Sequence, residues 1–254
     1  MFLQEYFGLD GKTVLVTGGN RGIGQEVSVD LAKAGARIAV FSRSGAEETV
    51  KKIRDSGGEA QSFLVDVQSE ESIKNGVARV IQVFGKIDVL FNNAGITIHK
   101  TVLDADYQDW EKILKTNLLG EMMVAKEVAK HMISEGIKGS IINMGSMSGT
   151  IVNVPQMQTL YNVSKAAVIH MTKSLAVEWA GYGIRVNCLS PGYIATDMSV
   201  NVDEKLKEQW MKMVPMHRMG KPSELSGAVI FLACDGAGYT TGCNLVVDGG
   251  YTCL

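Results

Sequence analysis

A tyrosine and a lysine four positions apart, Tyr161 and Lys165 in "YNVSK", are the residues of this sequence best suited to chemistry. Residues four apart lie on one face of a helix. A free tyrosine, with a pKa near 10, is a poor base at neutral pH, but a nearby positive charge favours its phenolate form. Such a pair could move a proton to or from a ketone or alcohol oxygen. In isolation the pair is more typical of an exposed helix surface, so the other motifs of the sequence must decide whether it is catalytic.

A glycine-rich turn stands near the start of the chain. In "VLVTGGNRGIG", Gly18, Gly22 and Gly24 lie between a predicted strand and a predicted helix. Glycine lets the backbone turn sharply and approach a pyrophosphate, whose charge is favoured at a helix N-terminus. A purely structural turn is the alternative, but its place after the first strand favours a dinucleotide site.

The end of the next predicted strand, "VFSRS", indicates which dinucleotide would bind. Sites for NAD usually place a carboxylate there to hold the ribose 2′-hydroxyl. This sequence has Ser42 with Arg43 beside it, and Arg21 lies in the glycine turn. Two guanidinium groups suit a 2′-phosphate, which favours NADP over NAD. Both arginines could instead be solvated surface charges.

The elements that position these residues alternate between short apolar runs and longer amphipathic stretches. Strands are expected at 12–18, 36–42, 60–66, 87–95, 139–146, 184–192 and 244–250. Helices are expected at 22–33, 45–56, 69–84, 109–135 and 159–181. Strands that are apolar on both faces and separated by helices predict an α/β fold with one doubly wound, Rossmann-like parallel sheet. No linker or repeat divides the chain, so residues 1–254 are predicted to form one domain.

Composition excludes several other classes of protein. The net charge of −2, with no basic stripe, argues against nucleic-acid binding, and no apolar run is long enough to span a membrane. The N-terminal segment does not resemble a signal peptide, and the four cysteines are scattered, so we expect a cytoplasmic protein with free thiols. The histidines form no metal-ligand pattern: His99, His131, His170 and His217.

The chain resembles the classical short-chain dehydrogenase/reductase family over nearly its whole length. Six segments carry the resemblance: "TGGNRGIG" (17–24), "DV" (66–67), "NNAG" (92–95), Asn117 in "KTNLLG", "YNVSK" (161–165) and "PGYIAT" (191–196). It implies that Tyr161 is the general acid/base, that Lys165 is its electrostatic partner and a ribose ligand, and that Asn117 holds a water in a proton relay.

The same resemblance implies a set of cofactor contacts. Asp66 and Val67 would contact the adenine, and Ile194 and Thr196 would contact the carboxamide end of the nicotinamide. The full implied set is Gly18, Asn20, Arg21, Gly22, Ile23, Gly24, Ser42, Arg43, Asp66, Val67, Asn93, Tyr161, Lys165, Ile194 and Thr196.

Two serines compete for the role of hydrogen bonding the substrate carbonyl. Ser148 lies thirteen positions before Tyr161, a spacing common in the family. Ser146 lies immediately after the predicted strand, and ligands of open α/β sheets bind at the carboxyl ends of strands. A loop can lengthen more easily than a strand end can move. We therefore favour Ser146 as catalytic and expect Ser148 to line the substrate pocket.

The stretch from Ile151 to Val168 and the ending "VVDGGYTCL" resemble the sugar and polyol branch of the family, which includes sorbose and xylulose reductases and mannitol dehydrogenases. This implies an NADP-dependent oxidoreductase for a small ketose–polyol or hydroxyketone pair. The alternatives are a 3-oxoacyl thioester reductase, a gluconate-type sugar-acid dehydrogenase, and a redox sensor without enzymatic activity. Polar groups of Asn153 and Gln156 could meet sugar hydroxyls or be solvated in a loop.

Two further expectations concern the second half of the chain. Residues 196–219 would form a flap over the substrate, in which Met211, Met213, Met216 and Met219 make an apolar lid or pack against the body. The tryptophans are more typical of packing residues: Trp110, Trp179 and Trp210. By family resemblance the chain is expected to form a homo-tetramer through the helices around 109–135 and 159–181.

Overall fold

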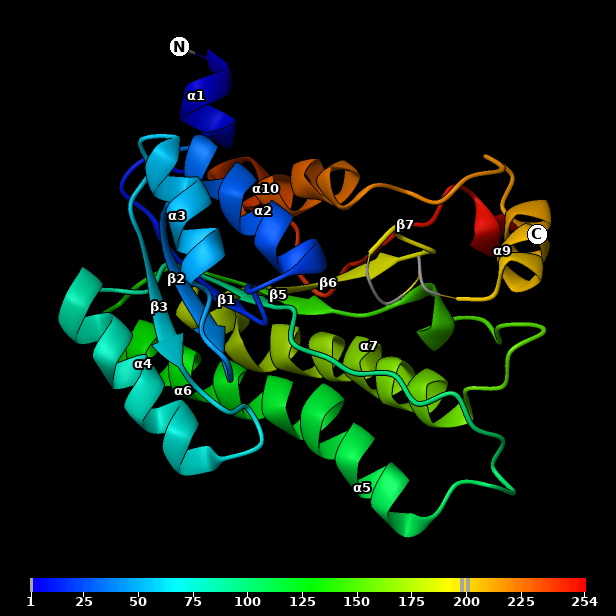
Figure 1. The fold of residues 1–254 in the computed structure, drawn as a ribbon. Helices are drawn as coiled ribbons and strands as arrows, with labels where there is room; N and C mark the ends of the chain where they lie inside the picture. Colours follow the sequence, from blue (N-terminus) through cyan, green and yellow to red (C-terminus); the bar gives the residue numbers. More distant parts are fainter. Residues whose placement is uncertain (1, 197–198, 200–201) are drawn as a thin grey trace.

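Parallel strands form one seven-stranded sheet in the order β3-β2-β1-β4-β5-β6-β7 (Figure 1). The structure is a computed structural model, and it describes residues 2–196, 199 and 202–254. This arrangement confirms the predicted Rossmann-like sheet. The strands are β1 (Thr13–Thr17), β2 (Arg37–Ser42), β3 (Ala60–Leu64), β4 (Val89–Asn92), β5 (Ser140–Met144), β6 (Arg185–Pro191) and β7 (Asn244–Val247).

Helices cover both faces of the sheet, which explains why its strands are apolar on both sides. Figure 1 shows α2, α3 and α10 on one face and α4, α5, α6 and α7 on the other. The helices are α1 (Phe2–Phe7), α2 (Gly22–Lys33), α3 (Glu47–Asp55), α4 (Glu70–Phe84), α5 (Tyr107–Leu114), α6 (Glu121–Ser134), α7 (Thr159–Trp179), α9 (Glu204–Met213) and α10 (Ser226–Ala233).

The two faces of the sheet form two separate hydrophobic cores. In β1, Val14 and Val16 belong to the core under α2 and α10, whereas Leu15 belongs to the core above α4 and α6. In β4, Phe91 and Leu90 alternate in the same way and lie beside Val16 and Leu15 in the register. Strand order reverses between β1 and β4, so the carboxyl ends of these strands form the topological switch point at which such sheets bind ligands.

The predicted helix at 109–135 is divided by a π-helical segment. α5 runs into η1 (Lys115–Gly120), where the backbone hydrogen bonds widen, and α6 follows without a break. The segment contains Asn117, whose side chain bonds the neighbouring loop, and π-helical turns often occur at functional sites. Helical periodicity alone could not reveal this local change of winding.

The predicted strand at 87–95 was too long, because only Val89–Asn92 pairs as a strand. The following residues, Asn93 and Ala94, form hydrogen bonds to the turn after β1 instead of extending the ladder. The tight turn at the switch point therefore ends the strand early.

Two helices near the C-terminus were not predicted as such. α10, "SGAVIFLA", is apolar throughout, so it lacks the amphipathic pattern of a surface helix, and it packs against α2 and β5. α9 lies within the predicted flap, of which residues 197, 198, 200 and 201 lie outside the described part. Of the described helices, none combines the length and apolar character that crossing a membrane requires.

Candidate active site

A cleft of about 580 Å³ opens at the carboxyl edge of the sheet. Residues that follow each of the strands β1 to β6 line it, together with the start of α7 and part of α9. Most residues singled out from the sequence meet here: Gly18, Asn20, Arg21, Gly22, Ile23, Ser42, Arg43, Asp66, Val67, Asn93, Ser146, Ser148, Tyr161, Lys165, Ile194 and Thr196. Gly24 and Asn117 do not line the cleft but lie behind it.

The glycine turn joins β1 to α2 in a conformation that side chains disfavour. Gly18 and Gly22 have φ values of 65° and 57°. At Gly24 a Cβ atom would lie 2.4 Å from the carbonyl oxygen of Gly18, so the first turn of α2 packs directly against the loop. The glycines thus bring the backbone and the N-terminus of α2 to the cleft, as a pyrophosphate site requires.

Asn93 fastens this turn to the end of β4. Its Nδ2 donates to the carbonyl oxygens of Thr17 and Gly18, each at 3.1 Å, and the amide of Ala94 donates to Thr17 Oγ1 at 3.0 Å. Asn93 therefore holds the two neighbouring loops of the switch point together. Thr17 was not predicted as a site residue, although a hydroxyl at the end of the first strand could have indicated a contact to the neighbouring loop.

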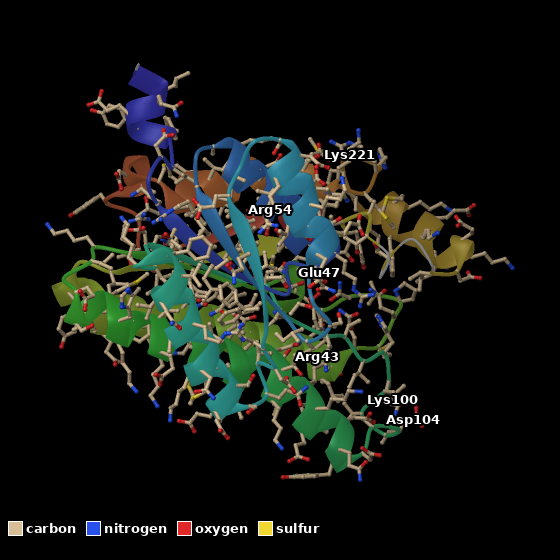
Figure 2. All side chains as sticks on the ribbon, turned by 60° about the vertical axis from the view of Figure 1, so that its left-hand side comes forward. Arg43, Glu47, Arg54, Lys100, Asp104 and Lys221 are labelled. Atoms are coloured by element: carbon tan, nitrogen blue, oxygen red, sulfur yellow. The ribbon has the colours of Figure 1, made fainter. Side chains whose placement is uncertain are left out.

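Positive charge without a partner lies at one end of the cleft. Arg21 and Arg43 are exposed, and neither guanidinium forms an ion pair with a carboxylate in the described part of the chain. Ser42 is buried beside Arg43, and its Oγ accepts a hydrogen bond from the Ser44 amide at 3.3 Å. In Figure 2, Arg43 lies between Glu47, at the start of α3, and the loop that carries Lys100.

The residues expected at the two ends of a dinucleotide lie on opposite sides of the cleft. Asp66 is half-buried after β3, and its Oδ1 accepts from the Gln68 amide at 3.0 Å. Val67 packs against Gly120 of the π-helical segment. Ile194 is buried and bridges to Gly220.

Both candidate serines lie in the cleft, next to β5. Ser146 is the N-cap of the short turn at Met147–Gly149, and its Oγ accepts from the Ser148 amide at 3.1 Å. Ser148 Oγ accepts a hydrogen bond from Gln158 Nε2 at 3.2 Å. Each hydroxyl therefore keeps its own proton for donation. Ser146 is fixed closer to the end of the strand, whereas Ser148 is tied to the loop before α7.

Tyr161 and Lys165 occupy the first turns of α7. Tyr161 is half-buried in the cleft wall, and Lys165 is only 2% exposed. The Lys165 Nζ donates to the Met144 carbonyl oxygen at 2.5 Å and lies 3.2 Å from Glu121 Oε1. Burial alone would lower the pKa of Lys165, but the Glu121 carboxylate, and then Tyr161, raise it, so this lysine stays charged.

Asn117 lies one layer behind the cleft. Its Oδ1 accepts from the Ile96 amide at 2.8 Å, and its Nδ2 donates to the Ile96 carbonyl at 2.9 Å and to Ser164 Oγ at 3.1 Å. The side chain therefore connects the π-helical segment to the loop after β4 and to α7. Both N–H groups of this amide and one lone pair of its oxygen are therefore engaged with the protein.

A polar and aromatic wall forms the far side of the cleft; Asn153 and Gln156 were named from the sequence, but the stacked ring of Tyr193 was not. Tyr193 stacks on Trp210 with ring centroids 4.3 Å apart, and Gln156 connects the two: its Nε2 donates to the Tyr193 hydroxyl at 2.9 Å, and its Oε1 accepts from Trp210 at 2.8 Å. Burial raises the pKa of Tyr193 to about 12, so its hydroxyl stays neutral. Tyr193 stands inside "PGYIAT", the one signal that could have indicated it.

Asn153, Gln156 and Gln158 form the polar part of this wall. Asn153 is 2% exposed, and its Oδ1 accepts from Gln158 Nε2 at 2.8 Å, so loop solvation does not explain it.

The described methionines of the predicted flap do not line the cleft as an apolar lid. Met211 and Met213 instead pack against Met147, Val214 and Tyr251, and Trp210 lines the cleft besides packing.

Comparisons with known proteins agree with this geometry. The family described as "Enoyl-(Acyl carrier protein) reductase" matches residues 18–252. An NADP-dependent mannitol dehydrogenase of Hypocrea jecorina is 41% identical over 98% of this chain and 96% of its own length. A galactitol 2-dehydrogenase (L-tagatose-forming) of Cereibacter sphaeroides is 40% identical over 99% of both chains. The crystal structure of a short-chain type dehydrogenase/reductase from Mycobacterium marinum superposes with a TM-score of 0.94, at 38% identity over 100% of both chains.

The two serines can be separated by matched variants. We expect Ser146→Ala to lower kcat about 10²–10³-fold, because it removes a donor to the reacting oxygen. Ser148→Ala should lower kcat less than tenfold and act mainly on KM. Steady-state kinetics of both variants test this, with thermal unfolding to confirm that each is folded. A larger kcat loss in Ser148→Ala would assign the role to that serine.

Proposed function

Since this chain belongs to the classical short-chain dehydrogenase/reductase family, whose enzymes act on CH–OH groups with NAD(P), we propose that it transfers a hydride between NADP and a small ketose–polyol pair. One observation carries the proposal. Ser146, Tyr161 and Lys165 line the same cleft as the glycine turn and as Arg21 and Arg43, which form no ion pair with the residues that the structure describes.

The residues of the cleft fit a dinucleotide with a 2′-phosphate. A Cβ atom at Gly18 would approach Ala94 to 3.0 Å, so the glycine turn can lie against the loop after β4 only because Gly18 has no side chain. Arg21 and Arg43 would hold the 2′-phosphate, and buried Ser42 offers a hydroxyl in place of the carboxylate that selects a free 2′-hydroxyl. Asp66, Val67, Ile194 and Thr196 would contact the adenine and nicotinamide ends.

Side chains of the cleft would then transfer the proton that accompanies the hydride. Oxidation of the alcohol takes a hydride from the carbinol carbon and a proton from its oxygen; bound NADP would accept the hydride. Tyr161 would accept the proton as a phenolate, which the charge of Lys165 stabilises. Ser146 would donate a hydrogen bond to the same oxygen, and Asn117 would hold a water in a proton relay. Reduction of the ketone reverses these steps.

The wall formed by Tyr193, Gln156 and Asn153 supports a polyhydroxy substrate. Hydroxyls and amides that converge on a cleft suit a ligand with several hydroxyl groups better than an acyl chain, which offers them no hydrogen-bonding group. The matched mannitol and galactitol dehydrogenases act on substrates of this class.

A substrate panel tests the proposal. Ketoses, polyols, gluconates and acyl thioesters should each be offered with NADPH/NADP and with NADH/NAD. We expect the highest kcat/KM for a ketose with NADPH and for its polyol with NADP. Preference for an acyl thioester or a gluconate would assign the chain to another branch, and cofactor binding without turnover of any compound would favour a redox sensor.

Tyr161→Phe should lower kcat by about 10²–10⁴-fold, because it removes only the hydroxyl that carries the proton. Cofactor binding, measured by fluorescence titration with NADPH, should change less than threefold. Tyr182→Phe removes the same hydroxyl from an exposed ring and serves as the control. Activity retained in Tyr161→Phe would overturn the proposed mechanism.

Arg43→Ala should raise KM for NADPH by about 10–100-fold, the equivalent of one lost hydrogen bond to a charged group. KM for NADH should change less than threefold. Arg54→Ala is the matched control, because Arg54 lies at the opposite end of α3 (Figure 2). An equal rise in KM for NADPH and for NADH would contradict the proposed preference for NADP.

A further inference from the structure

A second buried charge lies behind the active site, and the proposed mechanism does not use it. Glu121, the first residue of α6, is 2% exposed, and its Oε1 lies 3.2 Å from Lys165 Nζ. Its Oε2 is also buried and has no hydrogen-bond partner in the described part of the chain. A buried carboxylate persists only if its partner compensates the loss of hydration, so this contact is the main interaction that stabilises its charge.

Contacts of the neighbouring residues place the Glu121 side chain beside Lys165. Asn117 and Glu121 are four apart around the junction of η1 and α6, and they contact adjacent residues of α7, Ser164 and Lys165. Asn92 Nδ2 holds the backbone carbonyl of Glu121 at 2.9 Å, which fixes the start of α6 to the end of β4. Position 121 is thus set by contacts on two sides.

The hydrogen bonds that the Lys165 ammonium donates show how Glu121 orients it. One N–H of the ammonium points to the Met144 carbonyl and a second to Glu121. A Cβ atom at Gly95, which lines the cleft, would lie 3.6 Å from Nζ, so the remaining side of the ammonium faces the cleft. We propose that Glu121 is a positioning residue: its carboxyl group holds the Lys165 ammonium and sets the pH at which the Tyr161–Lys165 pair gives up its proton. This inference rests on the proposed function.

The charges around Glu121 are few, which makes its effect on Lys165 direct. Lys165 and, beyond it, Tyr161 face it from α7, and Cys188 faces it from β6. Burial raises the pKa of the Cys188 thiol to about 12, so it stays neutral. The other neighbours named above, Met144 on β5 and Asn92 on β4, carry no charge. Burial raises the pKa of Glu121 itself to about 7, and Lys165 opposes that rise.

An ionised Glu121 compensates the charge of Lys165, and a neutral side chain at this position leaves that charge to act on Tyr161 alone. In Glu121→Gln the acid limb of the pH profile of kcat/KM for alcohol oxidation should therefore move to lower pH by about one unit. Glu121→Asp keeps the charge and should stay within a few tenths of a unit of the wild-type limb. Glu127→Gln makes the same change on the same helix, at a partly buried carboxylate that pairs with Lys130 and not with Lys165, and it should leave the limb unchanged.

A readout independent of turnover follows from the raised pKa of Glu121. The folded chain holds a proton that the unfolded chain releases near pH 4.5, so the stability linked to that proton is present below this pH and is lost as the pH rises through about 7. The urea midpoint of the wild type relative to Glu121→Gln should therefore fall between pH 5 and pH 8. Glu121→Ala, which leaves room for water, replaces Glu121→Gln in both measurements if the glutamine variant does not fold.

The outcomes separate this inference from the proposed function. An active wild type whose glutamine variant keeps the wild-type limb, with only a lower kcat, would give Glu121 a merely structural role and overturn the inference. A wild type without turnover of any ketose or polyol would overturn the proposed function instead. In that case the urea midpoints decide. If the difference between the wild type and Glu121→Gln does not change with pH, the inference is rejected; if it falls between pH 5 and pH 8, the titration of Glu121 is supported.

Discussion

The buried ammonium of Lys165 is the constraint on which the architecture of the site depends. A charge removed from water is costly unless it is both paired and hydrogen-bonded. Here the partners come from two distant segments, the Met144 carbonyl at the end of β5 and the Glu121 carboxylate at the start of α6. Placing the lysine correctly therefore requires β5, α6 and α7 to pack in one way.

Buried amides extend this constraint into the sheet. Asn92 Nδ2 donates to the Glu121 carbonyl and to Asn143 Oδ1, and Asn143 Nδ2 donates to Thr172 Oγ1 on α7. Polar networks in a low-dielectric interior are costly to break, so they rigidify the elements they join. The base of the site is consequently held by strands and helices, which position catalytic groups more precisely than loops do.

The opposite wall of the cleft is built differently. Tyr193, Trp210 and Gln156 come from three segments that are joined here by a ring stack and two hydrogen bonds. Changes in these contacts would alter the shape offered to a substrate without disturbing Lys165.

Local chemistry explains what could be predicted from the sequence alone. The alternation of apolar runs and amphipathic stretches determines a parallel sheet covered by helices, the glycines near residue 20 determine a sharp turn, and the spacing of Tyr161 and Lys165 places them on one face of α7. Each of these features depends on residues within a few positions of one another. Only the tertiary structure decided that Glu121, forty-four positions before Lys165, is its ion-pair partner, that Asn117 lies behind the cleft in a π-helical turn, and that Tyr193 stacks on Trp210. Those contacts arise where distant elements pack, and periodicity and backbone preference carry no information about which side chains will then meet.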